Sequence, residues 1–462
     1  MAAPQQGSSE SSKSLPGDIP YDIIGVGFGP AALAIAIAMR DRGISARVLF
    51  LERQPEFGWH TGMLLPGSRM QISFLKDLAT MRNPTSPFTF LNYLHKQNRL
   101  THFVNLSTHT PLRQEFNAYM RWCASHFDDL VQYNQEVLKV TAIGDISHRP
   151  IDRFAVHVRD VRTGELRQLF AKHVIVATGG EKAIPPCLQG QNPGDRVIHS
   201  SEYLHTVGVK LPDETASYRV AVVGGGQSGV EIVEDVRSRY PKSQVSLFFR
   251  DSALRPSDDS PFVNEIFDPS SVDIFYQSSR AVRQQTLKDN KATNYGVVRL
   301  NLLEGLYEKL YEQKINDPDP SNWPLRLFSN HEVCGIEDAG NLKVKLKTKN
   351  RLTGVTSTTR DTYDLVVLAT GYQRDPVSGI LSNLKPLLSR SDSGEEFHVQ
   401  RDYRLTFRPG VVRDDAGIWL QGSCESTHGI SDSLLSILAV RSAEILDSIL
   451  ASLKSSEFRA RL

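Results

Sequence analysis

Two apolar runs of the chain each end in a glycine-rich turn and continue into a helical pattern. The first run begins at Tyr21, and an alanine-rich segment follows its glycines. The second begins at Arg219 and leads into a segment with apolar residues at helical spacing. A strand, a glycine turn and a helix in this order present backbone N–H groups to a pyrophosphate. The pattern therefore predicts two dinucleotide-binding units and, because the two dinucleotides would be bound together, electron transfer between them.

The first unit is predicted over residues 21–52, with its second strand ending at Glu52. An acidic side chain at that position can bind ribose hydroxyls, which favours a nucleotide without a 2′-phosphate, such as FAD. The predicted FAD-binding turn contains Gly25, Gly27, Gly29 and Pro30. Pro30 replaces the third glycine of the usual motif, but proline is sterically suited to the first turn of a helix.

The second unit keeps all three glycines of the motif, Gly224, Gly226 and Gly229. Its second strand, residues 245–250, ends at Arg250 where the first unit has a glutamate. A guanidinium suits a 2′-phosphate and therefore favours NADPH over NADH. The alternative for Arg250 is a solvated charge at a strand end, and the contrast between the two units favours the binding role.

Two further apolar runs, residues 172–180 and 363–372, both contain the tripeptide Ala-Thr-Gly at their ends. Continuous apolar runs of this length are typical of buried parallel strands. A glycine at the strand exit lets the backbone approach a cofactor closely. The chain is therefore predicted to leave a first domain near Gly179, to form a second domain, and to return near Thr370.

The fold class predicted from these patterns is α/β, with two Rossmann-like dinucleotide-binding domains and a small helical insertion at the substrate site. A length of 462 residues agrees with two or three domains. The FAD-binding domain is predicted over residues 21–210 and 364–462, the NADPH-binding domain over 211–257 and 321–363, and the insertion over 258–320. Residues 1–20, which are rich in Ser, Gln and Pro, are predicted to be a disordered tail.

An amphipathic helix is predicted to begin at Ser433 near the C-terminus. Ser431, Asp432 and Ser433 supply side chains that can cap its first turn. Its N-terminal amides and dipole would favour an anionic reduced flavin.

Charge and composition exclude several function classes. The formal net charge of +1 provides no basic excess for nucleic acid or for an anionic membrane. None of the four cysteines has the spacing of a metal site or a redox pair, so no metal is predicted and a reducing compartment is expected. Residues 23–39 are apolar but interrupted by glycines, unlike a membrane span. No targeting signal is evident, so we expect a cytoplasmic protein.

A flavin beside NADPH allows several reactions. Without a cysteine pair, the electrons must pass to a small substrate, a protein partner or O2. If they pass to O2, the flavin forms a C4a-hydroperoxide that can donate an oxygen atom, provided that water is excluded.

Seven motifs of the chain are similar to those of one known family. They lie at residues 26–33, 57–63, 70–80, 224–229, 259–267, 369–372 and 427–436. From Tyr21 onward the chain resembles the flavin-dependent N-hydroxylating monooxygenases, and most closely the fungal L-ornithine N5-monooxygenases of siderophore biosynthesis.

The resemblance implies a reaction, cofactors and an assembly. NADPH and O2 would hydroxylate the side-chain amine of L-ornithine to N5-hydroxyornithine through a C4a-hydroperoxyflavin, the first step of hydroxamate siderophore biosynthesis. FAD and NADPH would be the cofactors, and the assembly would be a homotetramer. An L-lysine N6-hydroxylase and a flavin electron-transfer oxidoreductase without hydroxylation remain alternatives.

The resemblance also implies roles for individual residues. FAD would contact Glu52, Arg53, Gln54, Pro55, Glu56, Phe57, Gly58, Trp59, His60, Gln71, Val137, Ser433, Leu434 and Leu435. NADPH would contact Gly225, Gly226, Gln227, Ser228, Arg250, Asn294, Tyr295 and Gly296. Lys76 would bind the substrate carboxylate, Asn264, Glu265, Ile266 and Phe267 its α-amino end, and Ser436 would also lie at the substrate. Lys76, Asn264 and Asn294 form the implied catalytic set.

The residues themselves leave structural alternatives open. Lys76 could extend to solvent, Asn264 could cap a helix, and Asn294 lies in a stretch that favours a turn. His60 and His428, beside glycine turns, are expected to be structural and receive no role in proton transfer.

Overall fold

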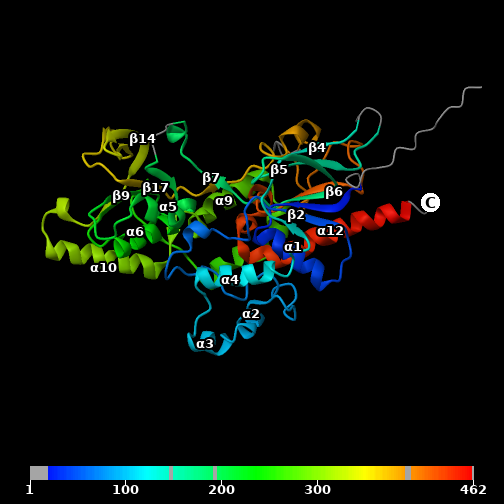
Figure 1. Cartoon of the computed structure of the whole chain (residues 1–462), viewed down its shortest axis with the longest axis horizontal. Coiled ribbons are helices and arrows are strands. Elements are labelled where there is room, and N and C mark those ends of the chain that lie inside the picture. Colours follow the sequence, from blue (N-terminus) through cyan, green and yellow to red (C-terminus); the bar gives the residue numbers. More distant parts are fainter. Residues whose placement is uncertain (1–18, 145–148, 191–194, 391–396, 460–462) are drawn as a thin grey trace, which may run out of the picture.

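The structure of the chain, a computed structural model, describes residues 19–144, 149–190, 195–390 and 397–459, with side chains up to residue 453 in the last helix. Two α/β units lie side by side along the long axis of the molecule (Figure 1). The tail predicted to be disordered, residues 1–20, lies outside the described residues except for its last two.

The first unit is built on a seven-stranded sheet. Its parallel strands are β3 (Val131–Gln132), β2 (Val48–Leu51), β1 (Tyr21–Val26), β6 (Leu166–Val176) and β19 (Gly417–Leu420), and β5 (Phe154–Asp160) and β4 (Gln135–Ala142) extend it in the antiparallel direction. Neighbouring residues Ile23 and Ile24 are both fully buried, so both faces of β1 are covered. Because β19 returns from the end of the chain to pair with β6, this unit is discontinuous in sequence.

Helices cover the first sheet. α1 (Pro30–Asp41) packs against α12 (Leu438–Arg459) and α4 (Arg113–Ala124), and every residue from Ala32 to Met39 is buried. A helix that is apolar on all sides is expected only where other elements enclose it. Two shorter helices, α2 (Phe90–Lys96) and α3 (Leu100–Asn105), extend outward below α4 (Figure 1).

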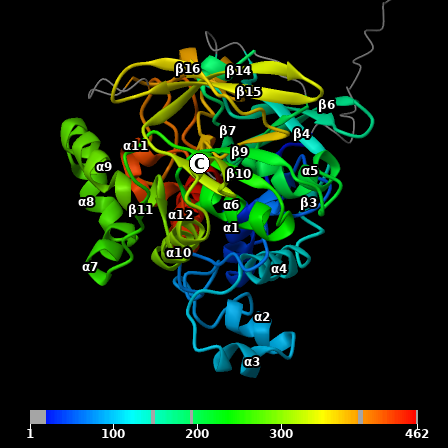
Figure 2. The same cartoon turned by 90° about the vertical axis from the view of Figure 1, so that its left-hand side faces the viewer.

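The second unit contains a five-stranded parallel sheet. Its order is β13 (Leu325–Phe328), β10 (Gln244–Phe248), β9 (Arg219–Val223), β17 (Leu365–Leu368) and β8 (Val197–His199). α6 (Gln227–Arg239) connects β9 to β10, and α10 (Leu300–Asn316) precedes β13. A three-stranded antiparallel sheet, β14 (His331–Gly340), β15 (Lys343–Asn350) and β16 (Thr356–Thr358), lies above it (Figure 2). The predicted α/β class with two Rossmann-like units is confirmed.

The strand pairing corrects the predicted domain boundaries. The prediction placed residues 197–199 and 365–368 in the first domain, but β8 and β17 pair within the second sheet. A strand of a few apolar residues carries no local signal that says which of two sheets it joins. The second sheet therefore extends over residues 197–368.

The predicted helical insertion, residues 258–320, is divided between the two units. α8 (Ser271–Gln277) and α9 (Arg280–Asn294) pack against α11 (Glu425–His428), and together with α7 (Pro261–Asn264) they lie on one flank of the molecule (Figure 2). α10 instead packs against the second sheet, since Leu306 belongs to the apolar core of that unit.

Two predicted element ends differ from the structure. α12 begins at Leu438, five residues after the predicted start at Ser433, and residues 430–437 form the 3-10 turns η7 (Ile430–Ser433) and η8 (Leu435–Ile437). Asp432 does not cap α12, because its carboxylate accepts from the backbone N–H of Cys424 at 2.6 Å and pairs with Arg441 at 2.8 Å. β10 ends at Phe248, two residues before Arg250.

The two Ala-Thr-Gly exits meet between the units. Directly after them, β7 (Glu181–Lys182) and β18 (Tyr372–Gln373) pair as a two-stranded antiparallel link. Thr370 of the second exit donates its hydroxyl to the carbonyl of Ala183 at 2.6 Å. No helix in the described part of the chain is long and apolar enough to cross a membrane.

Candidate functional site

The first glycine turn forms an open cradle at the start of α1. Gly27 has a φ of 90°, and a Cβ there would lie 2.6 Å from the carbonyl oxygen of Ala177. Gly29 is the N-cap of α1; within the described part of the chain, no side chain caps this end and a Cβ at Gly29 would meet no atom within 4 Å. The free N–H groups and the space above Gly29 fit the pyrophosphate of a dinucleotide.

Glu52 holds this turn from the end of β2. Its carboxylate accepts from the backbone N–H of Phe28 at 2.8 Å and from that of Gln54 at 2.9 Å. The backbone carbonyl of Glu52 accepts from Gln135 at 2.8 Å, which places the start of β4, and with it Val137, beside the turn. The acidic side chain that the sequence assigns to a ribose therefore lies next to the cradle.

The second glycine turn repeats this construction. A Cβ at Gly224, where φ is 132°, would lie 2.2 Å from the carbonyl oxygen of Ala369, and one at Gly229 would lie 2.0 Å from that of Gly224. Gly226 is the N-cap of α6 and also lacks a side-chain cap. Ala177 and Ala369, the first residues of the two Ala-Thr-Gly exits, thus contact equivalent glycines through their backbone carbonyls.

The segments assigned to NADPH meet around the second turn. A Cβ at Gly226 would be 3.6 Å from the Cα of Gly296, and one at Gly225 would be 2.9 Å from the Cβ of Phe249. Arg250, the next residue, is exposed beyond the end of β10. Asn294 is half-buried as the last residue of α9 rather than part of a turn, and the turn lies at Gly296, where φ is 73°.

The residues assigned to FAD after β2 divide into an exposed and a covered part. Arg53, Gln54, Pro55 and Glu56 are exposed, as is Gln71. Phe57 is buried, with its ring 6.4 Å from that of Phe28, and the backbone N–H of Trp59 donates to Asn117 at 3.1 Å. The half-buried Gly58 continues this covered part.

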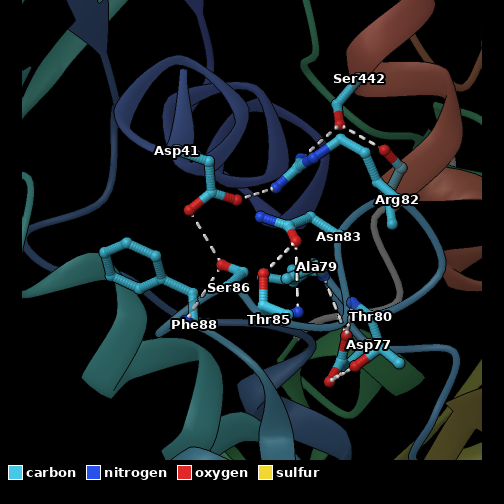
Figure 3. A network of polar contacts seen from close by, with 12 residues as sticks. Asp41, Asp77, Ala79, Thr80, Arg82, Asn83, Thr85, Ser86, Phe88 and Ser442 are labelled. Carbon is cyan, nitrogen blue, oxygen red and sulfur yellow. Dashed lines mark hydrogen bonds and ion pairs between the residues drawn. The ribbon is translucent and has the colours of Figure 1, made fainter. Parts of the chain in front are cut away.

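The loop that carries Lys76 is held by two buried aspartates. Asp77 accepts from the backbone N–H groups of Ala79, Thr80 and Phe90 at 2.9, 2.6 and 2.7 Å and from the hydroxyl of Thr80 at 2.8 Å. Asp41, at the end of α1, pairs with Arg82 and accepts from Ser86 at 2.9 Å (Figure 3). Burial raises the pKa of Asp77 despite these hydrogen bonds.

Lys76 itself is half-buried. Its ammonium has no carboxylate within ion-pair distance among the described residues, although it lies beside the fixed Asp77. The sequence allowed the ammonium of Lys76 either to extend to solvent or to bind the substrate carboxylate. Both are compatible with this position. What the structure adds is a rigid support, which a residue in a surface loop would lack.

The segments assigned to the substrate and to the flavin converge at η7. The turn η4 (Glu265–Phe267) packs against η7. Asn264 donates from Nδ2 to the carbonyl of Asp259 at 2.8 Å, so its amide NH2 stabilises its own loop. Tyr295 donates its hydroxyl to Glu425 and lies 3.1 Å from the hydroxyl of Ser433. This contact brings a residue assigned to NADPH to one assigned to FAD.

Ser436 is buried, and its hydroxyl has no hydrogen-bond partner among the described residues. Buried hydroxyls are normally satisfied. Leu434 and Leu435, just before it, are half-buried. A ligand that supplies a polar atom to Ser436 would complete this part of the site.

The two histidines near glycine turns are both held in the neutral form. His428 is fully buried, with Nδ1 2.8 Å from the hydroxyl of Thr427 and Nε2 3.1 Å from the carbonyl of Arg401, and burial lowers its pKa to about 4. Surrounding protein and the charges of Arg113 and Arg374 lower the pKa of His60 to about 4, although its ring remains accessible to solvent. Neither imidazole is a proton donor near neutral pH.

Three residues of this region were missed from the sequence. Arg374 lies close enough to His60, Tyr295 and Glu425 to influence their pKa values. Its only sequence signal is a cation just beyond the second Ala-Thr-Gly. Glu425 and Arg113 carry no local signal, because their neighbours come from distant segments.

Comparisons with known proteins agree with this geometry. Residues 19–374 match the family model of L-lysine 6-monooxygenase/L-ornithine 5-monooxygenase. An L-ornithine N(5)-monooxygenase of Ajellomyces capsulatus is 63% identical over 444 residues, which are 96% of this chain and 94% of that protein. The solved ornithine N-hydroxylase of Kutzneria sp. 744, with reduced FAD, NADP⁺ and L-ornithine, is 34% identical with a TM-score of 0.85, covering 94% and 99% of the two chains. The L-lysine 6-monooxygenase of Pseudomonas syringae is 26% identical with a TM-score of 0.78, covering 94% and 100%.

Proposed function

Because the chain belongs to the family of L-lysine 6-monooxygenases and L-ornithine 5-monooxygenases, we propose that it hydroxylates the side-chain nitrogen of L-ornithine, with FAD and NADPH as cofactors. The product, N5-hydroxyornithine, is a precursor of hydroxamate siderophores. The observation that carries the proposal is the pair of glycine cradles, at Gly29 and Gly226, each at a helix N-terminus that no described side chain caps.

The protein supplies binding, orientation and exclusion of water, while the bound flavin supplies electron transfer from NADPH to O2. The cradle at Gly29 and the carboxylate of Glu52 hold FAD. The cradle at Gly226 and the exposed guanidinium of Arg250 hold NADPH, since a cation at this strand end suits its 2′-phosphate. Tyr295, which contacts Ser433, keeps the two cofactor segments together.

The substrate lies between Lys76, Asn264 and Ser436 in this proposal. Lys76 binds its carboxylate as a charge-assisted hydrogen-bond donor, and the unpartnered hydroxyl of Ser436 receives one of its polar atoms. An alkylammonium has a pKa of about 10.4, so the reacting amine must lose its proton. Apolar surroundings favour this loss because they destabilise the charged form.

A product assay tests the proposal. Purified protein with FAD, NADPH and O2 is given L-ornithine or L-lysine, and hydroxylated amine, H2O2 and NADPH are measured. We expect hydroxylamine with ornithine. Lysine differs by one methylene, which a pocket distinguishes by only about 1–3 kcal/mol, so a preference for lysine would identify the alternative hydroxylase. Peroxide alone, with either amine, would contradict hydroxylation and support electron transfer only.

We also propose that the enzyme assembles as a homotetramer. Leu300, Tyr307, Tyr311 and Ile315 are exposed along one side of α10, opposite the side that packs on the second sheet. If α10 of a second copy lies antiparallel on this side, Tyr307 meets Tyr311 and Glu304 meets Lys314, so the contact is complementary in charge. This provides one of the interfaces that a tetramer needs. Light scattering should give four chains for the natural protein and fewer for Tyr311→Lys; a natural protein of one chain would contradict the proposal.

The location we propose is the cytoplasm. All four cysteines, Cys123, Cys187, Cys334 and Cys424, are free thiols, which agrees with a reducing compartment. Cell fractionation tests this, and recovery in the secreted fraction would contradict it.

A further inference from the structure

A series of hydrogen bonds runs along the second glycine turn. Arg299, which precedes α10, donates its backbone N–H to Oε1 of Gln227 at 2.9 Å, and Gln227 donates from Nε2 to Oε1 of Glu231 at 2.7 Å. Gln227 and Glu231 are one turn apart on α6, so they face the same side. The side-chain amide of Gln227 is therefore fixed at both ends.

Two contacts extend this series to the first unit. Arg113, the first residue of α4, donates from Nη1 to Oε2 of Glu231 at 3.0 Å, and the two side chains are only 16% and 7% exposed. Arg299 donates from Nη1 to the backbone carbonyl of Met70 at 2.7 Å. Backbone hydrogen bonds tie the segment around Met70 to the start of α4, so the series closes into a ring that spans both units.

Both sides of this ring adjoin the site. Gln227 is the first residue of α6, directly after the cradle at Gly226. Met70 is followed by Gln71 in the loop that carries Lys76. We infer that Arg299 is a positioning residue: through Gln227 and Met70 it holds the NADPH-binding turn at a fixed place against the loop that borders flavin and substrate.

If Arg299 holds this turn in place, losing its contact should change how the enzyme uses oxygen. This inference rests on the proposed function. Productive turnover converts NADPH, H⁺, O2 and the amine to NADP⁺, the hydroxylamine and water. Unproductive turnover converts NADPH, H⁺ and O2 to NADP⁺ and H2O2. Nucleotide that stays beside the flavin excludes water and favours the first outcome. A turn that is free to shift should release NADP⁺ sooner and divert turnover to peroxide.

The experiment uses the full-length, FAD-loaded protein with Arg299→Met and Arg299→Lys. Methionine keeps the length of the side chain but removes the donor to Met70, whereas the lysine ammonium can still donate to a carbonyl. We expect Arg299→Met to raise the dissociation constant of NADP⁺ about fivefold, the effect of one lost hydrogen bond, and to increase peroxide at the expense of hydroxyornithine. Arg299→Lys should restore most of the NADP⁺ affinity and most of the hydroxyornithine yield.

Further variants separate positioning from general stabilisation. Arg162→Met changes an exposed arginine in a distant hairpin turn and is the matched control. In a double-mutant cycle, Arg299→Met, which opens the ring at Met70, and Glu231→Gln, which weakens it at Arg113, should be non-additive in NADP⁺ affinity, since both break the same closed ring.

Three outcomes decide the matter. Unchanged NADP⁺ affinity and an unchanged product ratio in Arg299→Met would overturn the inference. So would a lower FAD content and melting temperature with an unchanged product ratio, because that pattern indicates a purely structural role. If the natural protein made no hydroxyornithine, the proposed function would fail, and NADP⁺ affinity would still test Arg299.

Discussion

Single residues of the site differ in how firmly their surroundings hold them. Lys76 is half-buried beside Asp77, whose carboxylate accepts hydrogen bonds from three backbone N–H groups. Ser436 is buried, and its hydroxyl has no hydrogen-bond partner within the part of the chain that the structure describes. Both were identified from the resemblance to a family and not from their local pattern, which for Lys76 equally allowed a solvated lysine.

At this scale, Lys76→Ala should raise the KM for ornithine and leave flavin reduction by NADPH intact. A hydrogen bond to a charged group contributes about 1.5–3 kcal/mol, so the KM should rise by about ten- to a hundredfold. Steady-state kinetics with product detection measures this. The matched control is Lys96→Ala, at the exposed end of α2. An unchanged KM would remove Lys76 from the substrate site.

A second prediction for a single residue concerns His173, which is fully buried in β6; neither of its ring nitrogens has a hydrogen-bond partner among the residues that the structure describes. Burial, followed by the charges of Arg404 and Lys172 and opposed by that of Asp415, lowers its pKa from 6.5 to about 3. Between about pH 3 and pH 6.5, the unfolded chain therefore binds a proton at His173 that the folded chain does not. The resulting stabilisation is complete above pH 6.5 and is lost as the pH falls below it, by about 1.4 kcal/mol per pH unit.

His173→Phe should reduce this loss, so that its melting temperature falls less than that of the natural protein between pH 7 and pH 5. The same substitution at the exposed His95 is the control. If the melting temperatures of the natural protein and of His173→Phe fell in parallel with pH, the imidazole of His173 would not contribute to the pH dependence of stability.

At the level of helices and strands, the glycines of the two turns are needed for two different reasons. Some must be glycine because the fold leaves no room for a Cβ, and others because a ligand needs the space. A Cβ at Gly229 would collide with the carbonyl of Gly224, whereas a Cβ at Gly29 would meet only open space. The φ of Gly29 is −77°, so alanine fits its backbone. Gly29→Ala should therefore fold normally but weaken FAD binding by about tenfold or more, because the methyl group occupies the place of the pyrophosphate.

Flavin absorbance per protein and the melting temperature of the apoprotein measure these two effects. Gly208→Ala, which adds a methyl group in open space on another helix, should change neither. Full flavin content in Gly29→Ala would mean that the cradle at α1 is not the FAD site.

Considered as a whole, the molecule has one sheet whose strands come from a single stretch of the chain, inserted in sequence between the strands of another sheet. All strands of the second sheet lie between residues 197 and 368, whereas the first sheet needs β19 from the end of the chain. A fragment of residues 195–370 should therefore fold and bind NADP⁺, while a fragment of residues 211–363 should not, because it lacks β8 and β17. Circular dichroism and the shift of the melting temperature with NADP⁺ distinguish them. Equal behaviour of the two fragments would contradict the assignment of these strands.

The sequence by itself determined the features that depend on neighbours in the chain. Glycines at fixed spacing impose the two turns, the charges of Glu52 and Arg250 follow two second strands closely, and apolar runs indicate buried strands. These features are local because a turn or a helix start is set by backbone conformations and side chains within a few residues.

The tertiary structure alone decided which distant segments meet. It assigned β8 and β17 to the second sheet, delayed the start of α12 by directing Asp432 to Arg441 and Cys424, and joined Arg299 to Met70. Each of these results depends on contacts between residues brought together by packing. Burial and hydrogen bonding are satisfied over the whole molecule, so no short stretch of sequence contains the information that settles them.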